Sequence, residues 1–331
     1  MTAAPENIHL VGSLAILAGG AAAMIFGAHL LVIASVRIAR RAGLSPFFIG
    51  MTLVAFGTSV PEMAASVYAQ LAGKQGIALG NVIGSNIANL ALVLGAVALF
   101  RPIPVKAPTL RRDLAMVICV GLVPLLALPT GNVLGLWHGI GLLGLLGVFL
   151  WVARTENRTD DADELGAADR WPVWRIILTI TSGPLLLWIG STLFIESASA
   201  LGREAGMSEA VIGLTIVAFT TSLPELITSV YAALRGYGDV GIGNIMGSCI
   251  MNVLAVLGLV LVFGDIPVEP QIYMLDVPVL FVVSVLCVPI LLSGRRVSRP
   301  EGGLLFLVYI GYMTLLVTLA PGWFSSGPTS G

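Results

Sequence analysis

Ten apolar stretches, each long enough to cross a lipid bilayer, constrain this chain more than any other feature. A membrane-spanning helix needs about 20 consecutive, mostly apolar residues. The stretches cover residues 9–36, 45–72, 76–100, 113–130, 133–153, 175–201, 208–234, 239–263, 272–292 and 302–320. They predict an all-α integral membrane protein with ten transmembrane helices, for which the lipid bilayer is the main partner.

The composition excludes several other classes of protein. Hydrophobic residues make up 57% of the 331 residues and charged residues only 11%, whereas a soluble domain has about 25% charged residues. Disordered chains are also rich in charge. A net charge of −1 argues against a nucleic-acid partner. The three cysteines are scattered through apolar stretches without metal-ligand spacing, so we expect neither a structural zinc site nor any cofactor.

One polar stretch divides the chain into two similar parts. Residues 154–174 are short, acidic and poor in apolar residues, which is typical of a linker. The sequence therefore predicts a first five-helix half over 1–153, a cytoplasmic linker over 154–174 and a second five-helix half over 175–331.

The basic residues predict the orientation of the chain. Of the 17 Lys and Arg residues, all but Lys74 and Arg203 fall in loops on one side of the predicted spans. Cytoplasmic loops have an excess of Lys and Arg, so both termini are predicted to be extracytoplasmic in a multi-pass protein of the cell (inner) membrane. The N-terminal apolar run has no basic residue ahead of it, which favours a retained helix over a secretory signal.

Each half contains a copy of one long motif. Residues 44–95 match residues 207–258 without a gap at a spacing of 163, and about half of the aligned positions are identical. Because each half has five spans, an odd number, the two copies enter the membrane from opposite sides. Repeats of inverted topology are typical of secondary transporters, which bind their substrate at the repeat interface near the bilayer midplane.

The repeated motif places a glutamate far from the ends of its span in each half. Glu62 and Glu225 each follow a proline. A carboxylate at the centre of a bilayer costs about 3 kcal/mol on insertion scales, and a proline leaves a backbone carbonyl without its helical donor. No Lys or Arg is predicted at the same depth, so protons or bound cations have to offset this cost.

Polar residues at helical spacing surround these glutamates. Hydroxyl groups precede each glutamate by three and four residues, and the next helix of each copy presents a serine and an asparagine on one face. These residues are Thr58, Ser59, Ser85 and Asn89 in the first copy, and Thr221, Ser222, Ser248 and Asn252 in the second. Such a set of oxygens, with no convergent His, Cys or Met, suits hard cations such as Ca²⁺ or Na⁺. The two carboxylates can equally balance protons.

At these residues the sequence resembles the calcium/cation antiporter superfamily, in its prokaryotic sodium/calcium exchanger-like branch. The resemblance lies in GTSVPE (57–62) with GNVIGSNIAN (80–89), and in TTSLPE (220–225) with GNIMGSCIMN (243–252). It implies a secondary active antiporter that exchanges Ca²⁺ for Na⁺, or for H⁺, by alternating access. It also implies that the first and sixth spans slide across the other helices.

The resemblance assigns a role to each residue of the motif. Glu62 and Glu225 would hold calcium, with backbone oxygen from Thr58 and Thr221 and with Asn89 as a polar member of the central site. The flanking sodium sites would use Ser59 with the Ala55 carbonyl and Ser222 with the Ala218 carbonyl, assisted by Ser85 and Ser248. Asn252 stands where several sodium/calcium exchangers have an aspartate, which leaves the stoichiometry open. Thr220 and Cys249 also depart from the usual glycine and asparagine.

Other interpretations stay open on the sequence alone. A proton-coupled exchanger of Ca²⁺, Mg²⁺ or K⁺ would use the same carboxylates, and a cation channel is a weaker alternative. An enzyme is disfavoured because neither motif pairs a serine with a histidine. Glu196 and His29 lie within predicted spans without partner spacing; Glu196 suits an ion entrance or the lipid interface equally well. We expect the protein to function as a monomer.

Overall fold

The computed structural model describes residues 4–104, 110–156, 171–205, 218–293 and 296–324. Within them, eight helices are long and apolar enough to span a membrane, and a bent pair, Pro46–Thr58 with Val60–Leu71, makes a ninth. The chain is therefore an all-helical, multi-pass membrane protein. The predicted span over 208–234 is described only from residue 218 onward, so the count of ten lies partly outside the described residues.

The first half follows the predicted spans closely. Helix α1 (Ala4–Ala42) precedes a bent span made of α2 (Pro46–Ile49), η1 (Gly50–Val54), α3 (Ala55–Thr58) and α4 (Val60–Leu71). The third span comprises α5 (Gln75–Ile87), η2 (Ala88–Val93) and α6 (Leu94–Phe100). The half ends with α7 (Leu110–Gly121), η3 (Val123–Thr130) and α8 (Leu136–Glu156).

The second half repeats this order. Helix α10 (Val173–Glu204) corresponds to α1, and α12 (Ala218–Thr221) with α13 (Leu223–Leu234) corresponds to α3 with α4. The next span comprises α14 (Gly238–Met251), η5 (Asn252–Leu257) and α15 (Gly258–Phe263). It is followed by η6 (Ile272–Asp276), α16 (Val277–Ser293) and α17 (Arg299–Phe324).

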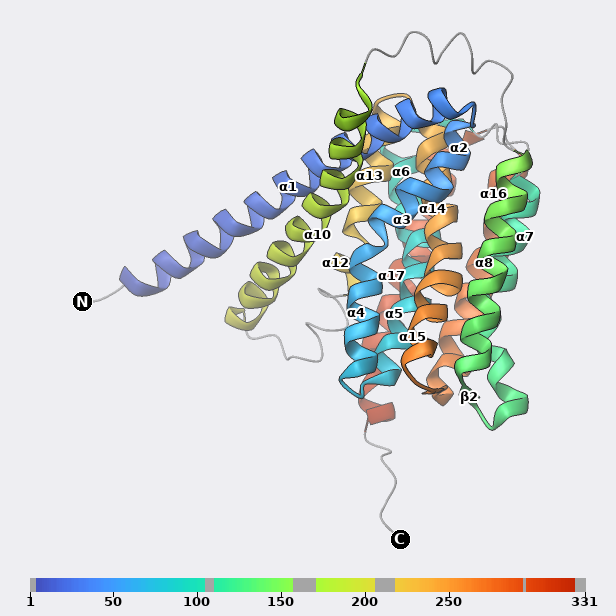
Figure 1. Ribbon diagram of the computed structural model, residues 1–331. Coiled ribbons are helices and arrows are strands. Elements are labelled where there is room, and N and C mark those ends of the chain that lie inside the picture. The colour runs from blue at the N-terminus through green and yellow to red at the C-terminus, as the bar shows by residue number, and fades with distance from the viewer. Residues whose placement is uncertain (1–3, 105–109, 157–170, 206–217, 294–295, 325–331) are drawn as a thin grey trace.

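Two short strand pairs show which loops share an end of the bundle. Strand β1 (Ile103–Pro104) pairs antiparallel with β4 (Arg296–Val297), and β2 (Val133–Leu134) pairs antiparallel with β3 (Ile266–Pro267). The first pair lies at the end where α8 ends and α10 begins, which we call the linker end. The second lies at the opposite end, the far end, where α1 begins and α17 finishes (Figure 1).

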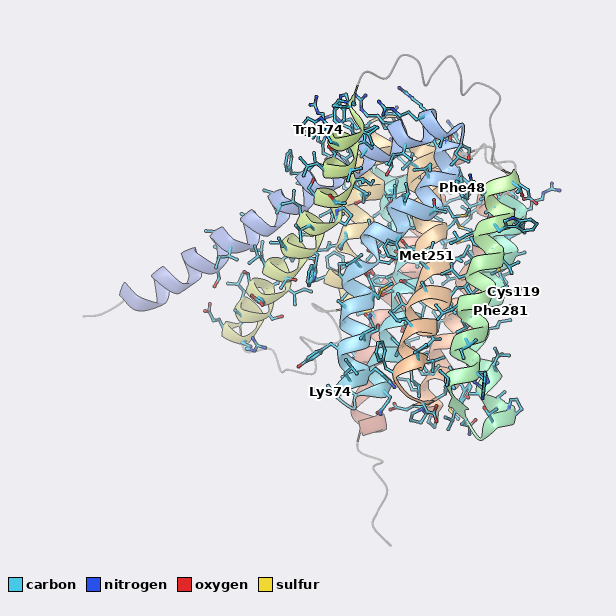
Figure 2. All side chains as sticks on the ribbon, in the orientation of Figure 1. Phe48, Lys74, Cys119, Trp174, Met251 and Phe281 are labelled. Atoms are coloured by element: carbon cyan, nitrogen blue, oxygen red, sulfur yellow. The ribbon has the colours of Figure 1, made fainter. Side chains whose placement is uncertain are left out.

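Polar contacts at the linker end join loops that the sequence assigns to one side. Arg41 donates to the Trp171 carbonyl, and Arg101 donates to the Leu234 carbonyl over 2.7 Å. Figure 2 shows Trp174 at the linker end and Lys74 at the far end, with Met251 between them. The described basic residues other than Lys74 and Arg203 thus belong to segments at the linker end.

Helices α1 and α10 pack side by side through glycines that are related by the repeat. A Cβ added at Gly20 would lie 2.7 Å from the Gly190 carbonyl oxygen, and one at Gly27 would lie 2.7 Å from that of Gly183. Gly20 and Gly183 are 163 residues apart, as are Gly27 and Gly190, so the contact is symmetric between the halves. Small residues allow such close approach in membranes. The repeat therefore extends beyond the motif that the sequence reveals.

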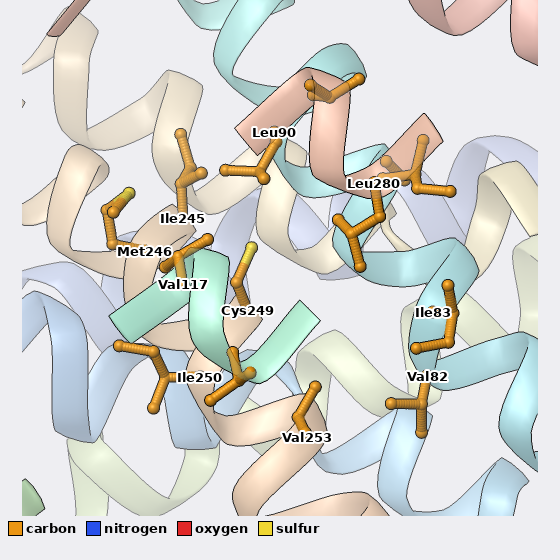
Figure 3. Packing of buried hydrophobic residues seen from close by; sticks show 14 of the residues in the cluster. Val82, Ile83, Leu90, Val117, Ile245, Met246, Cys249, Ile250, Val253 and Leu280 are labelled. Carbon is orange, nitrogen blue, oxygen red and sulfur yellow. The ribbon is translucent and has the colours of Figure 1, made fainter. Parts of the chain in front are cut away.

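The halves are intertwined rather than separate. Helix α6 of the first half packs on α17 of the second, where Gly95 meets the Gly302 carbonyl, and α15 packs on α8, where Gly258 meets the Gly139 carbonyl. Helices α5 and α14 form the centre of the bundle, and buried side chains of α7 and α16 pack against them, as Figure 3 shows. Glycines of α14 pack against the bent span: a Cβ at Gly243 would meet the Phe47 carbonyl and one at Gly247 that of Met51.

Candidate cation-binding site

The bent span and its counterpart break at repeat-related serines, directly before the glutamates. The helix axis bends by 45° between α3 and α4. Ser59, at the break, has φ −84° and ψ 5°, and Ser222, between α12 and α13, has φ −89° and ψ 5°. Pro61 and Pro224 lie in the first turn of the following helix, where proline favours the start of a new helix. Each break brings backbone and hydroxyl oxygens into the buried interior of the bundle.

The two glutamates meet in the interior of the bundle. Glu62 is 1% exposed and Glu225 is fully buried. Ser59 Oγ donates to Glu225 Oε1 over 3.2 Å, which links the two halves. The two carboxyl groups are close enough for the charge of Glu225 to act on Glu62. Both carboxylate oxygens of Glu62, and Oε2 of Glu225, have no hydrogen-bond partner among the described residues.

Such orphaned oxygens indicate a site that binds cations or protons. Buried polar atoms are nearly always hydrogen-bonded, and an unsatisfied one needs an explanation. Within the described residues the unpartnered set also includes the predicted ligands Ser85 Oγ, Ser222 Oγ, Asn252 Oδ1 and both side-chain polar atoms of Asn89. In these residues, no three or more His, Cys, Asp or Glu side chains lie close enough together to hold a metal ion. The site therefore combines two carboxylates with neutral oxygens.

Thr58 links the first motif to the second. Its Oγ1 lies 3.2 Å from the Ala55 carbonyl oxygen, 3.1 Å from Asn244 Oδ1 and 3.4 Å from Ser248 Oγ. The Ala55 carbonyl also accepts from the Ser59 amide over 3.0 Å. Predicted ligands of both halves thus lie around one point. Thr221 and Ala218 belong to α12, and Thr221 is buried.

The asparagines of the motif lie where the regular helix is interrupted. Asn89 lies in η2 and Asn252 begins η5, and both segments are π-helical. Single π-helical turns occur frequently at functional sites. Asn252 Nδ2 donates to Asn86 Oδ1 over 3.2 Å, and Asn86 Nδ2 donates to the Cys249 carbonyl over 3.1 Å. Because Asn86 and Cys249 are equivalent in the repeat, this contact lies where the two copies meet.

Sequence reasoning missed a second pair of asparagines. Asn81 Nδ2 donates to the Glu62 carbonyl (3.3 Å) and to Ser66 Oγ (2.9 Å). Asn244 Nδ2 repeats both contacts, with the Glu225 carbonyl (3.5 Å) and with Ser229 Oγ (2.9 Å). These contacts hold the helix that bears each glutamate against the next helix. The signal was available, because Asn and Ser are identical in both copies at these positions.

The fold and the site together define a multi-pass membrane cation transporter, and the comparisons give its family. The sodium/calcium exchanger protein family matches residues 12–154 and 175–318. The chain therefore belongs to the sodium/calcium exchanger family, in the prokaryotic branch of the calcium/cation antiporter superfamily, which confirms the resemblance in the sequence. Proteins of this family are transporters and not enzymes.

Relatives and solved structures cover nearly the whole chain. A putative antiporter, CaxA, of Alkalimonas amylolytica is 35% identical over 90% of this chain and 96% of its own length. The sodium/calcium exchanger MaX1 of Methanosarcina acetivorans is 29% identical over 88% and 95%. The structure resembles that of the sodium–calcium exchanger NCX_Mj soaked with 2.5 mM Na⁺ and 0.1 mM Ca²⁺, with a TM-score of 0.79, 30% identity and coverage of 92% and 98%.

Proposed function

We propose that this protein exchanges Ca²⁺ for Na⁺ across the membrane by alternating access, with Glu62 and Glu225 as the central ligands. One observation carries the proposal. Two buried carboxyl groups from opposite halves lie together, and among the described residues three of their four oxygens lack a donor. A divalent cation between them balances two negative charges, and two monovalent cations or protons do the same. Competition for one pair of carboxylates is the basis of exchange.

The neutral oxygens complete the proposed ion sites. Calcium would lie between the two carboxylates, with Asn89 and the backbone of Thr58 and Thr221 nearby. Sodium would lie to either side, near Ser59 with Ser85 and Ser222 with Ser248, and the Ala55 and Ala218 carbonyls would take part. The hydroxyls of Ser85 and Ser222 support this arrangement, because neither has a hydrogen-bond partner among the described residues. All donors are oxygens, as Ca²⁺ and Na⁺ prefer.

Proton coupling is the second candidate, because of one residue. Asn252 lies in the core of the site with its Oδ1 unpartnered among the described residues. A neutral amide there leaves the site with two carboxylates, where an aspartate would provide a third. With less negative charge, the site holds fewer sodium ions at once, or exchanges calcium for two protons.

We further propose the arrangement of the chain in the inner membrane. Ten spans with both termini extracytoplasmic place the linker end, where the described basic residues gather, on the cytoplasmic side, as the positive-inside rule requires. Strands β1 and β4 pair at one end of the bundle, and β2 and β3 pair at the other. These pairings support spans that cross the membrane in alternating directions. Each chain contains both copies of the motif and would work as a monomer.

Ion counterflow in sealed vesicles tests the function. Purified protein is reconstituted into proteoliposomes, and uptake of radioactive calcium is measured under a Na⁺ gradient, under an H⁺ gradient and without an ion gradient. We expect uptake that depends on the Na⁺ gradient. Uptake driven by H⁺ alone would establish proton coupling, and uptake that needs no counter-ion would identify a channel. Glu204→Gln is the matched control, because Glu204 is an exposed acid at the end of α10.

A further inference from the structure

The two helices that bear the glutamates, α4 and α13, are equivalent in the repeat but differ in what covers them. Thr228 of α13 is fully buried, whereas its equivalent in α4, Ala65, is exposed. Tyr231 is only partly exposed, whereas its equivalent Tyr68 is 73% exposed. Helix α1 packs along α13, and its residues Met24 to Val36 share a buried cluster with α13. The structure is therefore closed over α13, toward the linker end.

A line of polar residues leads from the ion site along the covered helix. Glu225, Thr228 and Tyr231 follow one another at intervals of three residues, and Arg235 lies four residues further on, at the linker end. Residues at such intervals lie on one face of a helix. In α4 the corresponding residues are Glu62, Ala65, Tyr68 and Ala72, so the line is interrupted there by alanine. Of the two described helices that bear the glutamates, α13 is therefore the one with an uninterrupted line of polar residues from its glutamate to its end.

Thr228 stands out within this line. It is completely buried, and its Oγ1 has no hydrogen-bond partner among the described residues. Leaving a buried hydroxyl without a hydrogen bond is unfavourable, because the group loses its contacts with water and gains none in return. An apolar side chain would pack at this position equally well, so packing alone does not explain the hydroxyl. One turn from Glu225, it suits an oxygen ligand for a cation that moves away from the carboxylates.

A single hydrogen bond closes this path further along. Tyr231 Oη and His29 Nδ1 lie 2.5 Å apart, which joins α13 to α1. The two rings also meet edge to face, with centroids 5.6 Å apart, and Arg235 lies over the Tyr231 ring at 5.3 Å. The contact therefore lies between Thr228 and the linker end, where α1 covers α13.

We propose that cations leave the central site toward the linker end along α13, past Thr228, and that the His29–Tyr231 pair is the gate of this path. The proposal rests on the proposed transport function. It assigns roles to three residues that the proposed ion sites do not use: Thr228 is a transient ligand, and His29 and Tyr231 position α1 over it. The repeat-equivalent positions, Thr192 of α10 and Tyr68 of α4, have a threonine in place of the histidine, so the same pair of rings does not occur there.

Accessibility of Thr228 tests the gate without any ion flux. Thr228→Cys is introduced together with Cys119→Ser, because Cys119 is the exposed native cysteine whereas Cys249 and Cys287 are buried. A membrane-impermeant maleimide is then added to one side of the vesicles at a time. With Tyr231→Phe, we expect labelling from the linker side to become about fivefold faster, the factor that corresponds to one neutral hydrogen bond. Tyr68→Phe is the matched control and should leave the labelling rate unchanged.

A second pair of variants guards against general loosening of the fold. His29→Ala removes the other partner of the bond and should raise labelling from the linker side in the same way, whereas Thr192→Ala, at the equivalent position of α10, should not. Unchanged labelling with both Tyr231→Phe and His29→Ala overturns the gate, and so does an equal increase with the two controls. Loss of exchange in Glu62→Gln with unchanged labelling in Tyr231→Phe rejects the gate and leaves the proposed function standing. Faster labelling in Tyr231→Phe and His29→Ala, together with normal exchange in the glutamate variants, supports the gate and rejects the role of the glutamates in the proposed function.

Discussion

The two glutamate-bearing helices show how one sequence motif acquires two environments. Helices α4 and α13 begin with the same serine, proline and glutamate, and the same Asn–Ser contact holds each of them. Yet α13 lies under α1, whereas Tyr68 and Ala65 of α4 are exposed. Since the local sequences are nearly the same, the difference comes from the position of the α1–α10 pair. Alternating access between inverted repeats requires such an asymmetry, because the site opens to one side of the membrane at a time.

The largest expected effect tests whether the two halves contribute equally. Glu62→Gln and Glu225→Gln each remove one of two charges that a divalent cation needs, so each should abolish calcium exchange in proteoliposomes. Ser59 bonds only to Glu225, but this does not make Glu62 dispensable. Full activity in either variant would rule out the central role assigned to that residue, provided that the Glu204→Gln control transports normally.

A smaller effect is expected where the two copies differ in their contacts. Asn244→Ala removes the donor to the Glu225 carbonyl and to Ser229 Oγ and also the acceptor for Thr58, whereas the contacts described for Asn81 are the equivalent donations to the Glu62 carbonyl and Ser66 Oγ. Outer-layer contacts of a metal site are worth about 10- to 100-fold in affinity. We expect the apparent calcium affinity to fall about tenfold in Asn244→Ala and less in Asn81→Ala. Equal losses would mean that the Thr58 contact contributes nothing.

The third comparison concerns the polar pair Asn89 and Asn252. Asn252→Asp adds a carboxylate in η5, which should change the dependence of exchange on sodium while calcium binding is retained. Exchange is measured as a function of Na⁺ concentration, and calcium binding by calorimetry in detergent. Asn89→Asp adds the same charge in the other copy and is the matched variant. An unchanged sodium dependence in Asn252→Asp would count against a place for this side chain in the ion site.

The smallest effect on exchange is expected at the α1–α10 contact, where the two halves are alike. Gly20→Ala and its equivalent Gly183→Ala each bring a methyl group within 3 Å of the facing helix. Overpacking of this kind costs about 1–3 kcal/mol, so both should lower the thermal unfolding temperature in detergent by a similar amount. Gly144→Ala is the control, because a Cβ there meets nothing described within 4 Å. A drop in only one of the pair would show that the contact is not symmetric in solution.

Much of the site was predictable because its residues occur twice. The glutamates, the hydroxyls before them and the Ser and Asn of the following helix could be recognised from spacing, and the structure brings them together. Asn81 and Asn244 were also identical in both copies, but their contacts run to a neighbouring helix and so leave no mark on local spacing. The symmetric glycines of α1 and α10 were missed for another reason. Few residues around them are identical, and the match appears only once the two helices are seen to touch.

Length and polarity along the chain determined the membrane-spanning helices by themselves, because every helix in a bilayer must satisfy its own backbone hydrogen bonds and present apolar side chains to lipid. The duplication likewise determined that two acids would occupy equivalent positions. Tertiary structure alone decided that those acids meet, that the halves interlock through α6 with α17 and α15 with α8, and that α1 covers α13. Such contacts depend on close approach of helices that are distant in the sequence, where packing of small residues and a few polar contacts select one arrangement among many of similar hydrophobicity.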